Sequence, residues 1–180
     1  MQKSNHLRKL IFCAILIAVQ IVLSRYGGIQ TQFIQTSLGF VPVAICSALL
    51  GPVYGSICAL LSDFLGVILA GTNAYCPLFS INAVLYALFY AFFLYKKEFK
   101  VSNIVWSVAL QTIIVAIPLT PLWLYIYYNY VLMTPQAFHL MAWPQVFVRL
   151  IEIPIKIAIL IPVCKFMLPK LEKLFVKKLH

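Results

Sequence analysis

The stretch LRKLIFCAILIAVQIVLS, residues 7–24, decides the structural class of this chain. It has two basic residues near its start, Arg8 and Lys9, and continues as an apolar run that, as a helix, crosses most of the about 30 Å of hydrocarbon in a bilayer. A basic start before an apolar run is also typical of a signal peptide. However, no cleavage site of the A-x-A type follows, and further apolar runs come after it. We therefore interpret the stretch as a first membrane span.

The composition of the whole chain leads to the same class. Hydrophobic residues make up 63% of the 180 residues, charged residues make up 10%, and the mean hydropathy is +0.98. Soluble domains carry about 25% charged residues, so we predict an all-α integral membrane protein. The net charge of +10 accompanies no nucleic-acid-binding motif, and the basic residues flank apolar runs. The lipid bilayer, with its anionic headgroups, is therefore the expected partner, and no nucleic acid is expected.

Apolar runs and their breakers divide the chain into six expected transmembrane helices within a single domain, residues 1–180. Gly51-Pro52 predicts a tight turn after the second span, which is short enough to be tilted, broken or partly re-entrant. Pro118 and Pro121 are expected to bend the fifth span, because each removes a backbone donor. A further interfacial helix is expected over residues 169–180. The expected spans are residues 7–24, 38–50, 53–70, 78–95, 101–128 and 143–168.

The basic residues are distributed asymmetrically along these spans. Because translocated loops of membrane proteins lose positive charge and cytoplasmic loops keep it, the basic clusters predict that both termini are cytoplasmic. Eleven of the 14 Lys and Arg residues fall in three clusters that this topology places on one side: Lys3, Arg8 and Lys9; Lys96, Lys97 and Lys100; and Lys165, Lys170, Lys173, Lys177 and Lys178.

Arg25, Arg149 and Lys156 lie outside these clusters and are candidates for binding an anion. Arg25 ends the first span on the outer side, and Arg149 lies about two turns into the sixth, where a guanidinium group can hold a carboxylate or a planar polar ring. Alternatively, Arg25 extends to the outer headgroups. Glu152 and Lys156 share the helix face of Arg149, which leaves one surplus positive charge. This face is either an internal ion-pair ladder or an attractant for an acidic ligand.

Aromatic and amide side chains gather near the same outer side. They fit either the interfacial belt of any membrane protein or a slot for a flat, hydrogen-bonding ring with an anionic tail. Asp63, in the middle of the third span, is a possible proton relay or substrate anchor, but a hydrogen-bonded structural role with a neighbour such as Ser62 is favoured. The candidates for the slot are Thr72, Asn73, Tyr75, Phe79, Asn82 and Trp123.

Motifs for catalysis, metal binding or cofactor binding are missing from the sequence. There is no phosphate-binding glycine-rich loop, no H-E-x-x-H and no nucleophile with a base, and the five cysteines show no metal-ligand spacing. We therefore expect neither an enzyme nor a metal or cofactor, and we interpret the cysteines as packing residues. Pairs of alanines four apart, such as Ala14 and Ala18, permit close helix packing but are not informative alone.

An ordered series of short motifs nevertheless resembles a known family, the folate-specific substrate-binding S components of energy-coupling-factor (ECF) transporters. The resemblance extends over nearly the whole chain. Its pieces are Ser24-Arg25, Ile29-Gln30-Thr31, Gly39-Phe40-x-Pro42, Leu50-Gly51-Pro52-x-x-Gly55, Asp63-Phe64-Leu65-Gly66, Pro77-x-Phe79-Ser80 and Arg149-x-x-x-x-Pro154.

The resemblance implies a six-helix subunit of the bacterial cell membrane that captures folate outside. A transmembrane coupling (T) subunit and two cytoplasmic ATPases would be its partners, and ATP would be bound only by them. Ala14 and Ala18 match the family's A-x-x-x-A element, which contacts the coupling subunit, and the loops 26–37 and 71–77 match those that gate the site. Arg25 and Arg149 match the ligand surface, and the resemblance carries Tyr75, Asn82 and Trp123 there as well.

Three other interpretations stay open from the residues alone. One is an S component for another vitamin or precursor, such as riboflavin, biotin, thiamine or a queuosine precursor, although a thiamine site should present acids. Another is a small membrane enzyme that uses Asp63 and Glu152 as acid and base, which requires the two carboxylates to converge. The last is a structural subunit without a ligand, in which Arg25 and Arg149 only anchor and pair.

Overall fold

The computed structural model describes residues 2–30, 35–70, 77–97, 100–131, 133 and 138–171. Its membrane part is helical, as the sequence predicts. α5 to η2 follow one another without a break, and so do α7 to α8. The helices are α1 (Gln2–Tyr26), α2 (Phe40–Leu50), α3 (Pro52–Ala70), α4 (Pro77–Leu94), α5 (Val101–Gln111), the π-helical η1 (Thr112–Ala116), α6 (Ile117–Ile126), the π-helical η2 (Tyr127–Val131), α7 (Phe138–Pro162), the π-helical η3 (Val163–Met167) and α8 (Leu168–Leu171).

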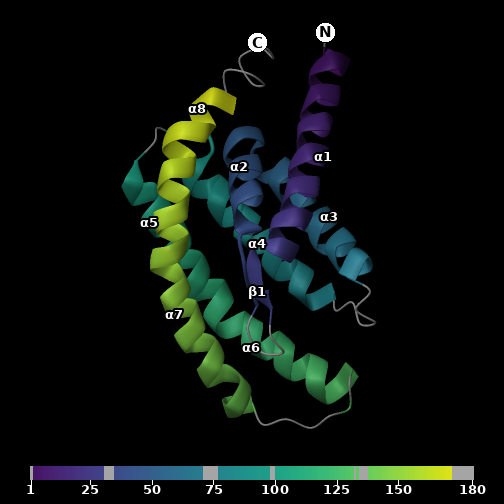
Figure 1. Cartoon of the computed structure of the whole chain (residues 1–180), viewed down its shortest axis with the longest axis vertical. Coiled ribbons are helices and arrows are strands. Elements are labelled where there is room, and N and C mark those ends of the chain that lie inside the picture. The colour runs from purple at the N-terminus through teal and green to yellow at the C-terminus, as the bar shows by residue number, and fades with distance from the viewer. Residues whose placement is uncertain are drawn as a thin grey trace.

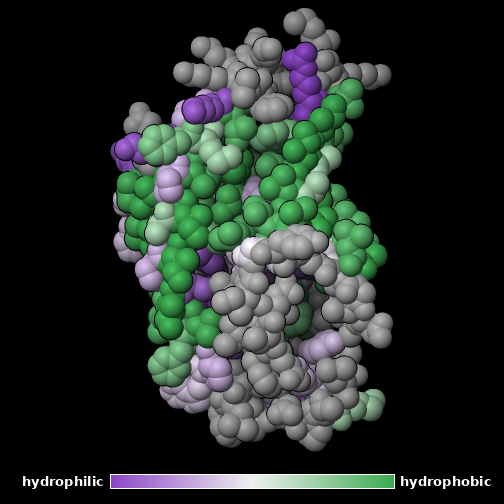
Figure 2. Space-filling model, in the orientation of Figure 1, coloured by the Kyte–Doolittle hydropathy of each residue, from purple (hydrophilic) through white to green (hydrophobic). Residues whose placement is uncertain are grey.

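Among the residues that the structure describes, three helical segments are long and apolar enough to cross a membrane: Leu7–Ser24, Pro52–Leu69 and Val101–Tyr130. α2 and α4 are shorter apolar helices. α7 begins at Phe138, earlier than the predicted start at Trp143, and the interfacial helix predicted for residues 169–180 lies mostly outside the described residues. Figure 2 shows a broad hydrophobic surface, with hydrophilic side chains gathered at the end where α1 begins and α8 lies.

Two short strands between α1 and α2 add to the helices. β1 (Gly28–Gln30) pairs antiparallel with β2 (Gln35–Ser37), with Ile29 opposite Thr36. The sequence pattern does not predict this ladder, because each strand has only three residues and no alternation of apolar and polar side chains is visible over so short a run. Figure 1 shows the pair directly below α2, between α2 and α6, in the half of the molecule away from the start of α1.

α2 is the central helix of the fold. Every residue from Pro42 to Leu50 is buried, and the helix contributes Val43 and Ala44 to one hydrophobic cluster and Ile45 and Cys46 to another. A helix that is apolar on all sides can pack against neighbours on all sides. The short second span of the sequence is therefore a helix buried among the others. α2 ends at the predicted Gly51-Pro52 turn, where Gly51 has a φ of +91° that favours glycine.

The described cysteines pack in the interior, as predicted. Cys13, Cys46, Cys58 and Cys164 are buried and free of disulfides. Cys13 of α1 lies against Cys46 of α2, with 3.7 Å between the two sulfur atoms. These small side chains therefore fill the space between packed helices.

Candidate functional site

A polar stripe runs along the inner face of α7. Gln145, Arg149, Glu152 and Lys156 are spaced by four, three and four residues, which places them on one side of a helix. Gln145 and Glu152 are buried, and the two cations are largely covered. The opposite face carries exposed apolar side chains: Phe147, Leu150, Ile151 and Ile155. α7 therefore presents apolar groups outward and charged groups to the other helices.

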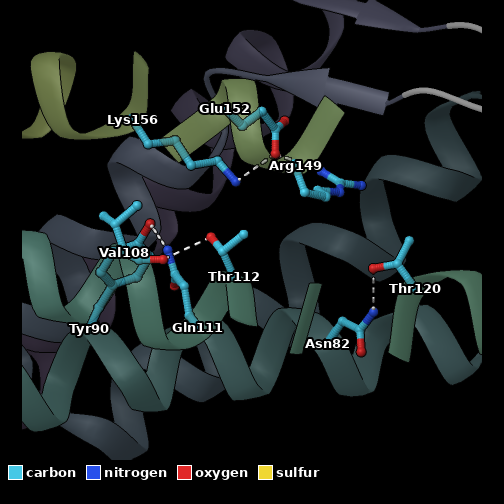
Figure 3. Close-up of polar contacts among 9 residues, drawn as sticks. All are labelled: Asn82, Tyr90, Val108, Gln111, Thr112, Thr120, Arg149, Glu152 and Lys156. Atoms are coloured by element: carbon cyan, nitrogen blue, oxygen red, sulfur yellow. Dashed lines mark hydrogen bonds and ion pairs between the residues drawn. The ribbon is translucent and has the colours of Figure 1, made fainter. Parts of the chain in front are cut away.

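The three charges of this stripe form one ion cluster. Arg149 Nη1 and Lys156 Nζ both donate to the same oxygen, Oε2 of Glu152, at 2.8 Å and 3.0 Å. The exposed fractions of the Arg149, Glu152 and Lys156 side chains are 11%, 4% and 13%. Two cations and one anion leave a net charge of +1 inside the protein (Figure 3). The surplus charge expected from the sequence is therefore present on the inner face of α7.

Aromatic rings enclose the Lys156 end of the cluster. The ammonium nitrogen lies 5.8 Å from the centre of the Phe40 ring on α2 and 6.0 Å from that of Tyr86 on α4. Cations are attracted to ring faces at such distances. Lys156 therefore connects α7 to α2 and α4, whereas Arg149 occupies the other end of the cluster (Figure 3).

A second polar group joins α4 to α6. The indole N–H of Trp123 donates to Asn82 Oδ1 at 3.0 Å, and Asn82 Nδ2 donates to Thr120 Oγ1 at 3.4 Å. Asn82 and Thr120 are buried. Phe79, one turn before Asn82, packs edge-to-face against Tyr127 with 6.4 Å between the ring centres. In Figure 3 the guanidinium group of Arg149 extends toward the side on which Asn82 and Thr120 lie.

A third polar group lies between α4 and the junction of α5 with η1. Gln111 Nε2 donates to the hydroxyl of Tyr90 at 2.8 Å, and the Thr112 hydroxyl donates to the Val108 carbonyl at 2.8 Å. Gln111 and Thr112 are neighbours in sequence, and both are buried. The π-helical turn that starts at Thr112 widens the helix here and is a type of distortion frequent at functional sites. It also lies directly before Pro118, where the sequence predicts a bend.

The predicted site residues divide into three sets. Phe79, Asn82, Trp123 and Arg149 come from α4, α6 and α7, and face the interior that these helices share. Thr72, Asn73, Tyr75 and the side chain of Arg25 lie outside the described residues, although the backbone of Arg25 belongs to the last turn of α1. Ala14 and Ala18 are exposed on α1.

Residue patterns alone did not identify Tyr86, Tyr90, Gln111, Thr112 or Thr120 as members of this interior. A signal existed for two of them, because Asn82, Tyr86 and Tyr90 recur every four residues in an otherwise apolar helix. Gln111, a buried amide inside an apolar span, was a further signal.

The two membrane carboxylates have separate partners. Ser80 of α4 donates to Asp63 of α3, whereas Glu152 pairs with Arg149 and Lys156. The structural partner expected for Asp63 is therefore Ser80 and not Ser62, whose hydroxyl bonds to the carbonyls of Cys58 and Ala59. The enzyme interpretation requires Asp63 and Glu152 to converge as acid and base, and the contacts of the described residues do not bring these two carboxylates together.

Comparison with known proteins gives one consistent answer. Residues 8–164 match the family described as ECF transporter, substrate-specific component. The folate transporter FolT of Clostridium novyi (strain NT) is 33% identical over 65% of this chain and 68% of its own length. The FolT of Leuconostoc mesenteroides subsp. mesenteroides is 29% identical over 84% of this chain and 82% of its own.

A solved structure agrees with these sequence relatives. The crystal structure of FolT bound with folic acid superposes with a TM-score of 0.75 at 30% identity, and the match covers 84% of this chain and 88% of that one. The family match spans most of the chain and includes the polar stripe of α7. This chain belongs to the family of substrate-specific components of ECF transporters.

Proposed function

We propose that this chain is the high-affinity folate-binding S component of an ECF transporter. Its relatives in Clostridium novyi and Leuconostoc mesenteroides are named folate transporters, and the FolT of similar structure binds folic acid. The observation in this chain that best supports folate is the ion cluster of α7, which puts one surplus positive charge beside aromatic and amide groups inside the protein.

The chemistry of folate matches this set of side chains. Folate has a flat polar pterin ring at one end and a glutamate with two carboxylates at the other. In the proposed site the aromatic faces of Trp123 and Phe79, and of Tyr75 in the outer loop, hold the ring. Arg149 and Arg25 hold the carboxylates or the pterin oxygen through charge-assisted hydrogen bonds. Thr72, Asn73 and Asn82 supply the remaining hydrogen bonds.

The proposed topology has six crossings in a single domain, residues 1–180, of a bacterial plasma membrane, with both termini cytoplasmic. The arrangement in Figure 1 supports it, since the start of α1, the end of α4 and α8 lie at one end of the molecule. The end of η2 and the start of α7 lie at the other. The segments at the first of these ends, α1, the end of α4 with the residues directly after it, and η3 with α8, carry the described members of the basic clusters that are predicted to be cytoplasmic.

The chain is proposed to act with a coupling (T) subunit and two ATPases and to hydrolyse nothing itself. Ala14 and Ala18 are the proposed contacts with the coupling subunit. Both are exposed on α1 and separated by one turn, so another helix can approach the backbone closely. ATP hydrolysis by the partners then drives release of folate to the cytoplasm.

The test of substrate identity is intrinsic tryptophan fluorescence of the purified chain in detergent, titrated with folate and corrected for the absorbance of folate itself. Riboflavin, thiamine and biotin serve as controls of different charge. Saturable quenching by folate alone at submicromolar concentration is the expected result. Saturation by one of the other vitamins, or by none of the four, contradicts the proposal.

A further inference from the structure

In the ion cluster of α7 one carboxylate oxygen accepts from two cations. Arg149 and Lys156 lie one turn before and one turn after Glu152 and bond to its Oε2 atom from both sides. All three residues belong to the same helix, so their spacing is fixed by α7 alone. The carboxylate of Glu152 therefore lies between the two cations and offsets one of their two positive charges.

Burial makes this net charge effective beyond direct contact. The three side chains are at most 13% exposed and their helix is apolar on its outer face. Charges in such surroundings are screened less than charges at a surface in water. A ligand carboxylate near Arg149 consequently experiences the summed charge of all three residues.

Lys156 contributes to that sum from inside the protein. Its ammonium group lies between Glu152 and the rings of Phe40 and Tyr86, at the end of the cluster away from Arg149. It therefore adds a positive charge to the cluster from the side away from Arg149. A ligand held at Arg149 does not need to touch Lys156 to respond to its charge.

We propose that Glu152 is a specificity-determining residue, which holds the cluster at a single positive charge and so sets how strongly the site prefers two carboxylates over one. This inference rests on the proposed function, since it assumes that the anionic end of folate lies near Arg149. The neutral amide of glutamine in place of Glu152 would remove the anion of the cluster and raise its net charge from +1 toward +2. Methionine in place of Lys156 would leave a charge of zero.

The experiment compares two ligands that share the pterin and differ in charge. Folate carries two carboxylates and pteroate carries one. The dissociation constants of both are measured for the wild type, Glu152→Gln, Lys156→Met and the double variant Glu152→Gln/Lys156→Met. The double variant has the wild-type charge of +1 without the ion pair. Lys165→Met is the control for a charge change at an exposed position.

The preference for folate, measured as the ratio of the pteroate and folate dissociation constants, should follow the net charge of the cluster. Glu152→Gln should raise the ratio about tenfold and Lys156→Met should lower it about tenfold, as expected for one unit charge about 12 Å from the second carboxylate of folate at an effective dielectric constant of about 20. The double variant should return to the wild-type ratio, and Lys165→Met should not change it.

Two outcomes overturn the inference. One is an unchanged ratio in both single variants. The other is a double variant whose ratio follows one of the single variants, because contacts and not charge would then decide. If Glu152→Gln alone does not fold, Lys156→Met and the double variant still test the inference. The ratio should then be lower in Lys156→Met than in the wild type and should return to the wild-type value in the double variant. A wild type that does not bind folate contradicts the proposed function itself, and the two failures are thereby distinguished.

Discussion

Trp123 donates its indole N–H to the side-chain oxygen of Asn82 at 3.0 Å, and this hydrogen bond joins α6 to α4 inside the protein. Asn82 is buried and also donates to Thr120, so its amide is oriented from both sides. The indole ring is consequently held at a defined angle by a polar contact. A flat ligand binds more favourably to an indole ring that is already fixed, because that side chain does not have to be ordered on binding.

Replacement of Trp123 by phenylalanine should weaken folate binding and abolish most of the fluorescence response. The variant keeps an aromatic ring but leaves the buried Asn82 oxygen without its donor, at an expected cost of about 1–3 kcal/mol of stability. Thermal unfolding without ligand measures this loss, and direct calorimetric titration measures the affinity independently of fluorescence.

Trp106→Phe is the matched control, because Trp106 is 57% exposed on the outer side of α5. It should leave stability, affinity and quenching close to the wild type. Quenching that disappears in Trp106→Phe and persists in Trp123→Phe would remove Trp123 from the proposed site.

The helices and the α2–α3 turn were predictable from local sequence. Apolar runs of membrane length are unambiguous, and Gly51-Pro52 combines a glycine suited to positive φ with a proline suited to a helix start. The β1–β2 ladder was not predictable, because strands of three residues carry no periodic signal. Gln111 and Thr112 continue the buried positions of Ser107 and Val108 one turn earlier, whereas the π-helical turn η1 that begins at Thr112 has no local signature in the sequence.

The charged part of the candidate site was predictable for a different reason. Charges inside an apolar span are rare, and Arg149, Glu152 and Lys156 fall on one face by helical spacing alone. The pairs Trp123–Asn82 and Gln111–Tyr90 join residues of different helices, 41 and 21 positions apart. They depend on how the helices pack, which a single sequence does not specify.

Arg149→Ala should weaken folate binding about 100-fold, as expected when a charge-assisted hydrogen bond of about 1.5–3 kcal/mol is lost. Glu152 keeps Lys156 as a partner in this variant, so the protein should still fold. Arg149→Lys should recover part of the affinity, because it restores the charge but not the planar fork. Calorimetric titration of each purified variant gives the affinities.

Lys170→Ala is the control for the two Arg149 variants, since Lys170 is exposed on α8. It should bind folate like the wild type. Unchanged affinity in Arg149→Ala would show that the cluster has only a structural role.

Ala14→Trp should leave folate binding intact and block transport. The bulky ring would keep another helix from approaching α1 at the surface formed by Ala14 and Ala18. Uptake of labelled folate by cells that produce all subunits measures transport, and titration of the isolated chain measures binding. Ala158→Trp, at an exposed alanine of α7, adds the same volume elsewhere and should permit uptake. Equal uptake by the two variants would place the contact with the coupling subunit on another surface.

Gly55→Ala should destabilise the fold, because α2 and α3 touch at this residue. A Cβ atom there would lie 2.3 Å from the Ser47 hydroxyl oxygen and 2.9 Å from Ser47 Cα. To relieve these contacts the two helices must separate, with an expected loss of about 1–3 kcal/mol of stability.

Gly66→Ala is the control in the same helix, since its Cβ would meet nothing within 4 Å. That variant should not lower the unfolding temperature in detergent, because alanine favours helix more than glycine does. Adding Ser47→Gly to Gly55→Ala should recover only part of the stability, since the hydroxyl contact disappears and the contact with Cα persists. If Gly55→Ala unfolds at the same temperature as Gly66→Ala, α2 and α3 do not touch at Gly55.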